Sequence, residues 1–198
     1  MKHTFLLLVA FTFFFASCKK EEVITTHPET QKITNLHAPA DVRDQQTGDI
    51  TQENPYVYFN FAKADTVPQT ENWDIAFKGT KIITNSGVSG TGDAKATILS
   101  ATFDDVTEVN DSNLKVDTDA VLAIPSGSDN GWYHYNPTNH LITPIAGKVI
   151  VVKTNDGKYA KMEILSYYKD APAEPTATTQ DATLTFNFIY QGDGTNKF

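Results

Sequence analysis

Polar and hydrophobic residues alternate along much of the chain beyond residue 55, and this period of two is typical of β-strands. In the run Tyr56–Phe61 the alternation places Val57, Phe59 and Phe61 on one face. Aromatic and β-branched residues, which favour strands, dominate this run. Further strands are expected at residues 73–77, 81–84, 96–103 and 121–124, and at residues 183–190 near the end of the chain.

An Asp156-Gly157 pair between two strand-like runs predicts a β-hairpin, because glycine accepts the positive φ that a tight turn requires. The arms of this hairpin are residues 148–154 and 158–168. The returning arm alternates between the apolar Ala160, Met162 and Ile164 on one face and the charged Lys161 and Glu163 on the other. We therefore expect one dry face and one solvated face.

Little helix is expected. A helix fits only at residues 103–113, where the periodicity is weak. The predicted class is all-β, with a single antiparallel β domain built as a sandwich or a partly closed barrel.

The first seventeen residues predict a cleaved signal peptide. Lys2 precedes an apolar run, Phe5–Ala16, that is too short to span a bilayer. The run ends just before Cys18, an arrangement that resembles the lipobox of bacterial lipoproteins. Acylation of Cys18 would anchor the chain to a membrane, since each buried methylene contributes roughly 0.8 kcal/mol. The alternative is a single buried structural thiol. The chain has no second cysteine, which argues against a structural disulfide at this position.

The charged run Lys19–Glu22 resembles the tag of surface-exported lipoproteins in the Bacteroidetes. That resemblance implies an outer-membrane lipoprotein exposed at the cell surface, whereas the simpler interpretation is a solvated charge run. Residues 18–54 are expected to form the lipidated cysteine and a polar tether, because they hold few large apolar residues. The β domain is then expected over residues 55–198.

Charge and motifs argue against two classes of function. The sequence has 24 acidic and 16 basic residues, a net charge of −8, so nucleic acid is not an expected partner. Catalysis is not expected either: the neighbouring acids Asp104 and Asp105 would face opposite ways on a strand. No serine or cysteine has a recognisable base beside it.

Several stretches resemble the HmuY family of Bacteroidetes. They are residues 72–77, the loop at 85–90, the closing strand at 183–190 and, above all, the hairpin at 149–168 with its Asp-Gly turn followed by Lys158. The resemblance covers roughly residues 55–190 in order. It implies a surface lipoprotein that takes haem from host haemoproteins and passes it to a TonB-dependent outer-membrane receptor for iron acquisition.

Haem binding requires an apolar slot and one or two axial donors, commonly His or Met. In the expected domain the only histidines are His134 and His140, and Met162 lies on the apolar face of its strand, which is typical of the core. Both histidines are therefore candidate axial ligands, and no metal other than haem iron is expected. If the turn pairs Tyr135 with His140, the two imidazoles project from opposite faces of the ribbon and cannot clamp one haem between them.

The resemblance places one axial histidine upstream of the tryptophan, where residues 121–130 hold neither His nor Met. Trp132, Tyr133 and Tyr135 either offer aromatic surface for a macrocycle or form a partly buried aromatic hairpin. Three outcomes stay open. They are haem capture through a single histidine or with the help of a tyrosine, a different planar or hydrophobic ligand in the same cleft, and a lipoprotein that has lost haem and acts as a structural or protein-interaction module.

Overall fold

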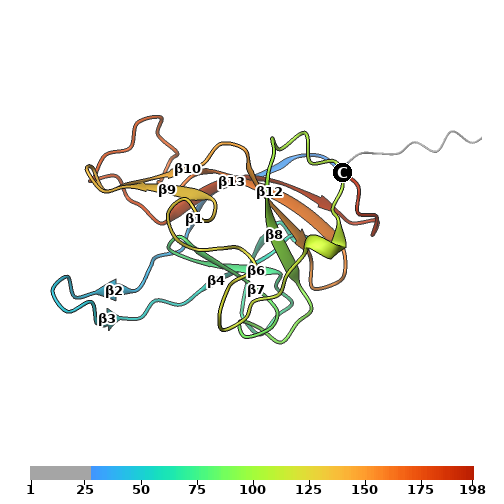
Figure 1. The fold of residues 1–198 in the computed structure, drawn as a ribbon, viewed down its shortest axis with the longest axis horizontal. Helices are drawn as coiled ribbons and strands as arrows, with labels where there is room; N and C mark the ends of the chain where they lie inside the picture. Colours follow the sequence, from blue (N-terminus) through green and yellow to red (C-terminus); the bar gives the residue numbers. More distant parts are fainter. Residues whose placement is uncertain (1–27) are drawn as a thin grey trace, which may run out of the picture.

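The computed structural model describes residues 28–198 and confirms an all-β, antiparallel fold (Figure 1). Within that range, the one helical element is the short 3-10 helix η1 (Asp111–Asn113). No helix among the described residues is long and apolar enough to cross a membrane. The predicted signal peptide, Cys18 and the charged run Lys19–Glu22 lie outside the described residues and stay predictions.

The larger sheet has five strands in the order β1-β13-β12-β11-β8. Their bounds are β1 Gln31–His37, β8 Lys95–Ser100, β11 Lys148–Lys153, β12 Tyr159–Ser166 and β13 Thr183–Gln191. Strands β11 and β12 form the hairpin predicted from the Asp-Gly pair. Gly157 in its turn has a φ of +78°, which glycine adopts without strain.

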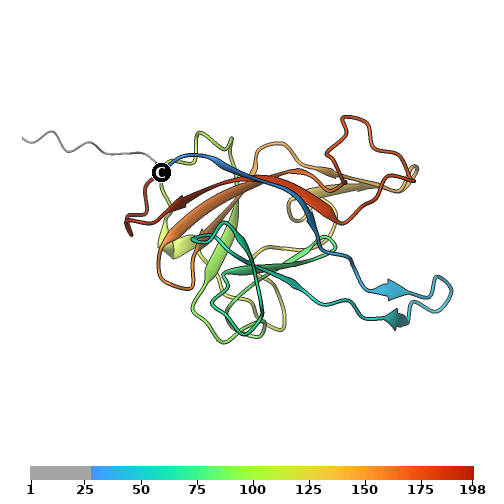
Figure 2. The ribbon, with the colours of Figure 1, turned by 180° about the vertical axis from the view of Figure 1, so that it is seen from behind.

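The second sheet has four strands in the order β5-β4-β6-β7, and two small hairpins complete the fold. The sheet comprises β4 Val57–Asn60, β5 Asp65–Val67, β6 Ile75–Lys78 and β7 Lys81–Thr84; the hairpins are β2 Val42–Arg43 with β3 Ile50–Gln52, and β9 Tyr133–Asn136 with β10 Leu141–Pro144. Figures 1 and 2 show both hairpins projecting from one end of the molecule, while the C terminus lies at the other end.

Phenylalanine rings hold the two sheets together. Phe186 of β13 lies 5.5 Å from Phe59 of β4 and 5.7 Å from Phe77 of β6, measured between ring centroids. Phe188 lies 5.6 Å from Phe61 in the same way. All five rings are buried, and such contacts add about 0.5–1.5 kcal/mol per pair to the burial of their area. The predicted inward faces of both sheets are therefore confirmed, and the sheets pack as a sandwich.

The expectation of a solvated face on β12 is wrong, because the outer face of the larger sheet is also covered. Lys161 is only 3% exposed. Its Nζ donates to the carbonyl oxygens of Phe103, at 2.7 Å, and Val106, at 2.8 Å, and burial lowers its pKa. The segment 103–113, the one place where a helix fitted the sequence, is irregular up to η1 at its end and lies over the sheet. Its apolar residues recur every third position, which produced the helix-like pattern.

The expected tether is partly wrong, since the β domain begins before residue 55. Strand β1, within the segment 18–54, pairs with β13 and forms the edge of the larger sheet. Leu36 is buried there and Ile33 packs against the core. An edge strand needs few apolar residues because backbone hydrogen bonds to its neighbour hold it in place. The polar composition of the segment concealed it.

Residues 121–124 form no strand, contrary to the prediction. The side chain of Asp117 takes the backbone bonds that a neighbouring strand would have supplied: its Oδ1 accepts the N–H of Ala123, and its Oδ2 accepts the N–H of Thr84, at 2.8 and 2.9 Å. The segment is therefore an irregular loop fixed to the end of β7.

A buried carboxylate joins the second sheet to the β11–β12 turn. Asp74 is 1% exposed, and its two oxygens accept the N–H groups of Phe61 and Asn155, both at 2.8 Å. Burial raises the pKa of Asp74, although the two hydrogen bonds oppose that shift. The side chain therefore ties the residue that follows β4 to the β11–β12 turn. Asn155 in that turn lies 81 residues beyond Asp74 in the sequence.

The substitution Asp74→Asn is expected to lower the free energy of unfolding by about 1–3 kcal/mol, because the amide can accept only one of the two buried N–H groups. Urea denaturation measures the loss. Asp49→Asn, in the exposed β2–β3 turn, is the matched control and should leave the urea midpoint unchanged. Equal stability of Asp74→Asn and the wild type would contradict this role.

Candidate functional site

The β9–β10 hairpin is fastened to the core by two aromatic residues at its base. Trp132 is 2% exposed, and its indole N–H donates to the carbonyl oxygen of Thr80 at 3.0 Å. Tyr133 is 8% exposed, and its hydroxyl accepts a hydrogen bond from Thr80 Oγ1 at 3.3 Å. Trp132 and Tyr133 therefore anchor the base of the hairpin to the β6–β7 turn. Of the three aromatic candidates of the hairpin, only Tyr135, which is 38% exposed, offers an open surface.

A tight loop over residues 125–131 lies against the free edge of β9. A Cβ at Gly131 would stand 2.1 Å from the carbonyl oxygen of Pro125, so a side chain there would prevent the loop from closing. Ser128 Oγ accepts the N–H of Tyr135 at 2.8 Å, and the N–H of Asp129 donates to the carbonyl of Tyr133 at 2.9 Å. The loop thus places the Asp129 carboxylate beside β9.

His134 is held by that carboxylate. Its Nδ1 lies 2.8 Å from Asp129 Oδ1, and the His134 side chain is 52% exposed. The hydrogen bond from His134 lowers the pKa of Asp129, with a smaller contribution from Ser128. An imidazole fixed at one nitrogen by a carboxylate presents its other nitrogen in a defined direction, as metal-binding histidines do. Sequence reasoning missed Asp129, whose role depends on how the loop folds.

The second candidate histidine pairs with a tyrosine. The hydroxyl of Tyr135 lies 2.7 Å from Nδ1 of His140. The register differs from the predicted one: Tyr135 pairs with Ile142, and Asn136 pairs with Leu141. His140 therefore ends the turn, where its φ is +60°, instead of lying on a strand. The hydrogen bond from Leu141 N–H to Asn139 Oδ1, at 3.1 Å, supports this turn.

The two imidazoles lie on different sides of the hairpin. Neighbouring residues of a strand point to opposite faces, so His134 points away from the face that carries Tyr133 and Tyr135. His140 reaches the Tyr135 hydroxyl and therefore belongs to the Tyr135 side. The predicted separation of the two histidines agrees with this arrangement even though the register was wrong. One haem cannot take both as axial ligands within one chain.

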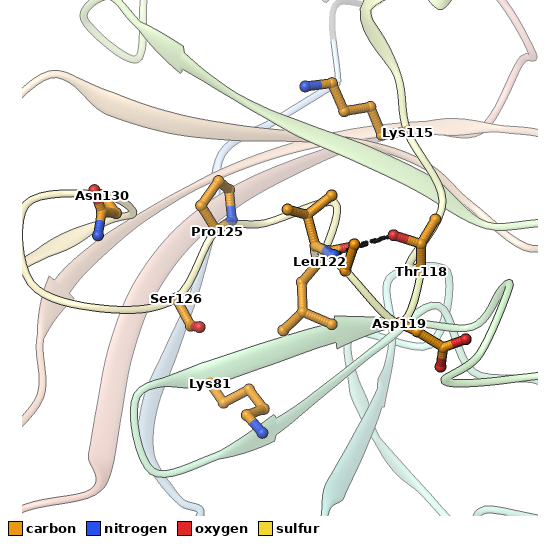
Figure 3. Close-up of a pocket in the computed structure, with 10 residues that line it drawn as sticks. Lys81, Lys115, Thr118, Asp119, Leu122, Pro125, Ser126 and Asn130 are labelled. Carbon is orange, nitrogen blue, oxygen red and sulfur yellow. Dashed lines mark hydrogen bonds between the residues drawn. The ribbon is translucent and has the colours of Figure 1, made fainter.

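Among the cavities, one lies beside the 125–131 loop and one lies beside β10. The larger has a volume of about 680 Å³ and lies between β7 and the loop that follows Lys115; Figure 3 shows Lys81 and Lys115 on opposite sides of Leu122 and Pro125. The smaller, of about 320 Å³, lies between β10, the end of β12 and the segment 172–175. Neither cavity is lined by His134, Tyr135 or His140. Among the described residues, no three His, Cys, Asp or Glu side chains are grouped to hold a metal ion.

The geometry defines an all-β domain that carries exposed imidazole and phenol groups on a hairpin at one end. The family model described as HmuY protein matches residues 52–188, and the chain belongs to the HmuY family. The predicted resemblance is therefore confirmed.

Solved structures are similar to this chain at low identity. The apo HmuY analog (TFO) of Tannerella forsythia is 19% identical, with a TM-score of 0.44 and coverage of 83% of this chain and 95% of that one. A Bacteroides vulgatus protein proposed to be HmuY-like and haem-binding is 16% identical, with a TM-score of 0.44 and coverage of 84% and 93%. Apo PinO of Porphyromonas gingivitis is 15% identical, with a TM-score of 0.46 and coverage of 82% and 97%. No curated protein matches the chain.

Trp132→Phe is expected to destabilise the protein by about 1–3 kcal/mol, because the partly buried carbonyl of Thr80 loses its donor. Hydrogen exchange should accelerate at the amides of β9 and β10 more than at those of β12. Trp73→Phe, at a second buried tryptophan that packs on Tyr58, controls for the smaller ring. Unchanged exchange in the hairpin of Trp132→Phe would show that Trp132 does not anchor it.

Proposed function

We propose that this protein is a haem-binding lipoprotein of the outer-membrane surface that serves iron acquisition, and that the β9–β10 hairpin supplies the protein ligand to the iron. One observation carries the proposal: Nδ1 of each histidine of the hairpin lies within hydrogen-bond distance of an oxygen atom, so Nε2 is the nitrogen left to bind iron. Membership of the HmuY family supports haem as the ligand and a carrier role in place of catalysis.

The donor set suits haem better than a bare metal ion. The porphyrin fills four coordination positions itself, so the protein needs to add only one or two donors. The hairpin offers single donors on each face and no described cluster of three. His134, oriented by Asp129, and the Tyr135–His140 pair are the groups that would hold the iron. When bound, the haem would supply iron as cargo.

The remaining parts of the proposal concern location and partners. Lipid on Cys18, together with the run Lys19–Glu22, would tether the domain at the outer surface. Haem would come from host haemoproteins and pass to a TonB-dependent receptor. A donor on an exposed hairpin suits such a transfer, because the partner can reach the iron without opening the core.

Titration of ferric haem into the purified protein is expected to shift the Soret band to a new, saturating position. The double variant His134→Ala with His140→Asn should weaken binding by about tenfold or more, since no imidazole then remains on the hairpin. Asparagine is used at position 140 because it tolerates the left-handed φ found there.

His37→Ala provides the matched control. His37 lies on β1, is exposed and contacts Thr183 Oγ1 at 3.1 Å, so its loss should leave the titration unchanged. Absence of any Soret shift in the wild type contradicts haem binding. A shift that survives in the double variant at full affinity contradicts ligation by the hairpin histidines.

A further inference from the structure

The cavity between β7 and the loop that follows Lys115 has an apolar wall. Its volume of about 680 Å³ lies in the range of pockets for small organic ligands. Val121, Leu122 and Pro125 all line it. Val121 is 65% exposed, the largest exposed fraction among the exposed large apolar residues of the described chain. A ligand with an apolar body would therefore remove this wall from contact with water.

Two lysines border the same cavity. Figure 3 shows Lys81, at the start of β7, and Lys115 on opposite sides of Leu122 and Pro125. The backbone of Lys115 is fixed by two hydrogen bonds to Ala96 of β8, each of 2.9 Å. Within residues 28–198 neither lysine takes part in an ion pair, although the chain has an excess of acidic residues. Two ammonium groups are thus available to an anion in the cavity.

The apolar wall is held in place by hydrogen bonds of its own segment. Asp117 is 1% exposed, and its carboxylate accepts the N–H groups of Ala123 and Thr84. Thr118 Oγ1 donates to the carbonyl oxygen of Val121 at 2.9 Å and accepts the Val121 N–H at 3.1 Å. The segment is therefore ordered before a ligand binds, which reduces the entropic cost of binding.

We propose that this cavity binds an organic dianion. The apolar body of the dianion lies against Val121 and Leu122, and each of its two anionic groups pairs with one lysine. Asp119 also lines the cavity and repels an anion, but the two lysines outweigh its single charge. The site is separate from the β9–β10 hairpin, whose imidazoles and exposed phenol lie outside the cavity lining, so the inference does not depend on haem binding.

The test uses three probes that share an aromatic body and differ in charge: 2,6-naphthalenedicarboxylate, 2-naphthoate and the neutral 2-naphthol. Isothermal titration calorimetry of the purified protein at neutral pH measures their affinities. Each added carboxylate is expected to strengthen binding about threefold to fivefold, the scale of one ion pair at a protein surface. Added sodium chloride should reduce the advantage of the dianion and leave 2-naphthol binding little changed.

Variants assign the probes to this cavity. Lys81→Gln and Lys115→Gln should each weaken dianion binding about threefold to fivefold without changing 2-naphthol binding, and Asp119→Asn should strengthen it by up to the same factor. Val121→Ser should weaken the binding of all three probes, because the aromatic body loses an apolar contact. Lys32→Gln, at an exposed lysine of β1 outside the cavity lining, is the matched control and should bind as the wild type does.

Three results would overturn the inference: no binding of the dianion by the wild type, equal affinities for all three probes, or unchanged dianion affinity in both lysine variants. Dianion binding that is lost in His134→Ala with His140→Asn, yet retained in Lys81→Gln and Lys115→Gln, would place the anion on the hairpin and also overturn it. Thermal unfolding of each variant at the wild-type temperature shows that a loss of binding does not come from a loss of fold. The Soret titration tests the hairpin by itself, so the two proposals fail separately.

Discussion

The packing of β13 against the second sheet is the constraint on which the rest of the structure depends. Phe186 and Phe188 fill the space between the sheets and contact rings from β4, β6 and the residue that follows β4. Strand β13 also pairs with β1 on one side and β12 on the other. One strand thus fixes both the order of the larger sheet and its distance from the smaller one. The hairpins at the end of the sandwich project from a rigid base.

That base determines what the β9–β10 hairpin can present. Trp132 ties the start of β9 to the β6–β7 turn and packs 6.1 Å from the ring of Tyr167, a residue whose pKa is raised by burial. Beyond this anchor the strand alternates, so the next two side chains point to opposite sides. The same alternation that builds the core therefore separates the two histidines and gives each face of the hairpin one donor group.

Sequence patterns predicted the features that depend on neighbours in the chain. The alternation in β4, β12 and β13 and the Asp-Gly turn were read correctly because period and turn chemistry are local. Strand β1 was missed, since pairing at the edge of a sheet leaves a weak apolar signal. The burial of Lys161 was missed because the segment that covers it, 103–106, is more than fifty residues away.

The candidate site was predictable only in part for the same reason. The histidines and aromatic residues of the hairpin could be named from residue type, but the partner of His134 comes from a loop whose path depends on Gly131 and on contacts with β9. The turn was predicted at residues 136–139 but occupies residues 137–140, and a hydrogen bond to Asn139 Oδ1 supports it there. Tyr135 therefore pairs with Ile142, two residues beyond the predicted His140. Which donors are paired and which are free became visible only in three dimensions.

The central claim is that the hairpin gives bound haem one axial protein ligand instead of a two-histidine clamp. Electron paramagnetic resonance of the ferric haem complex tests this claim most directly, since the spin state of the iron reports the number and strength of its axial ligands. The account predicts a high-spin ferric signal. A low-spin signal typical of two imidazole ligands from a single chain would contradict it.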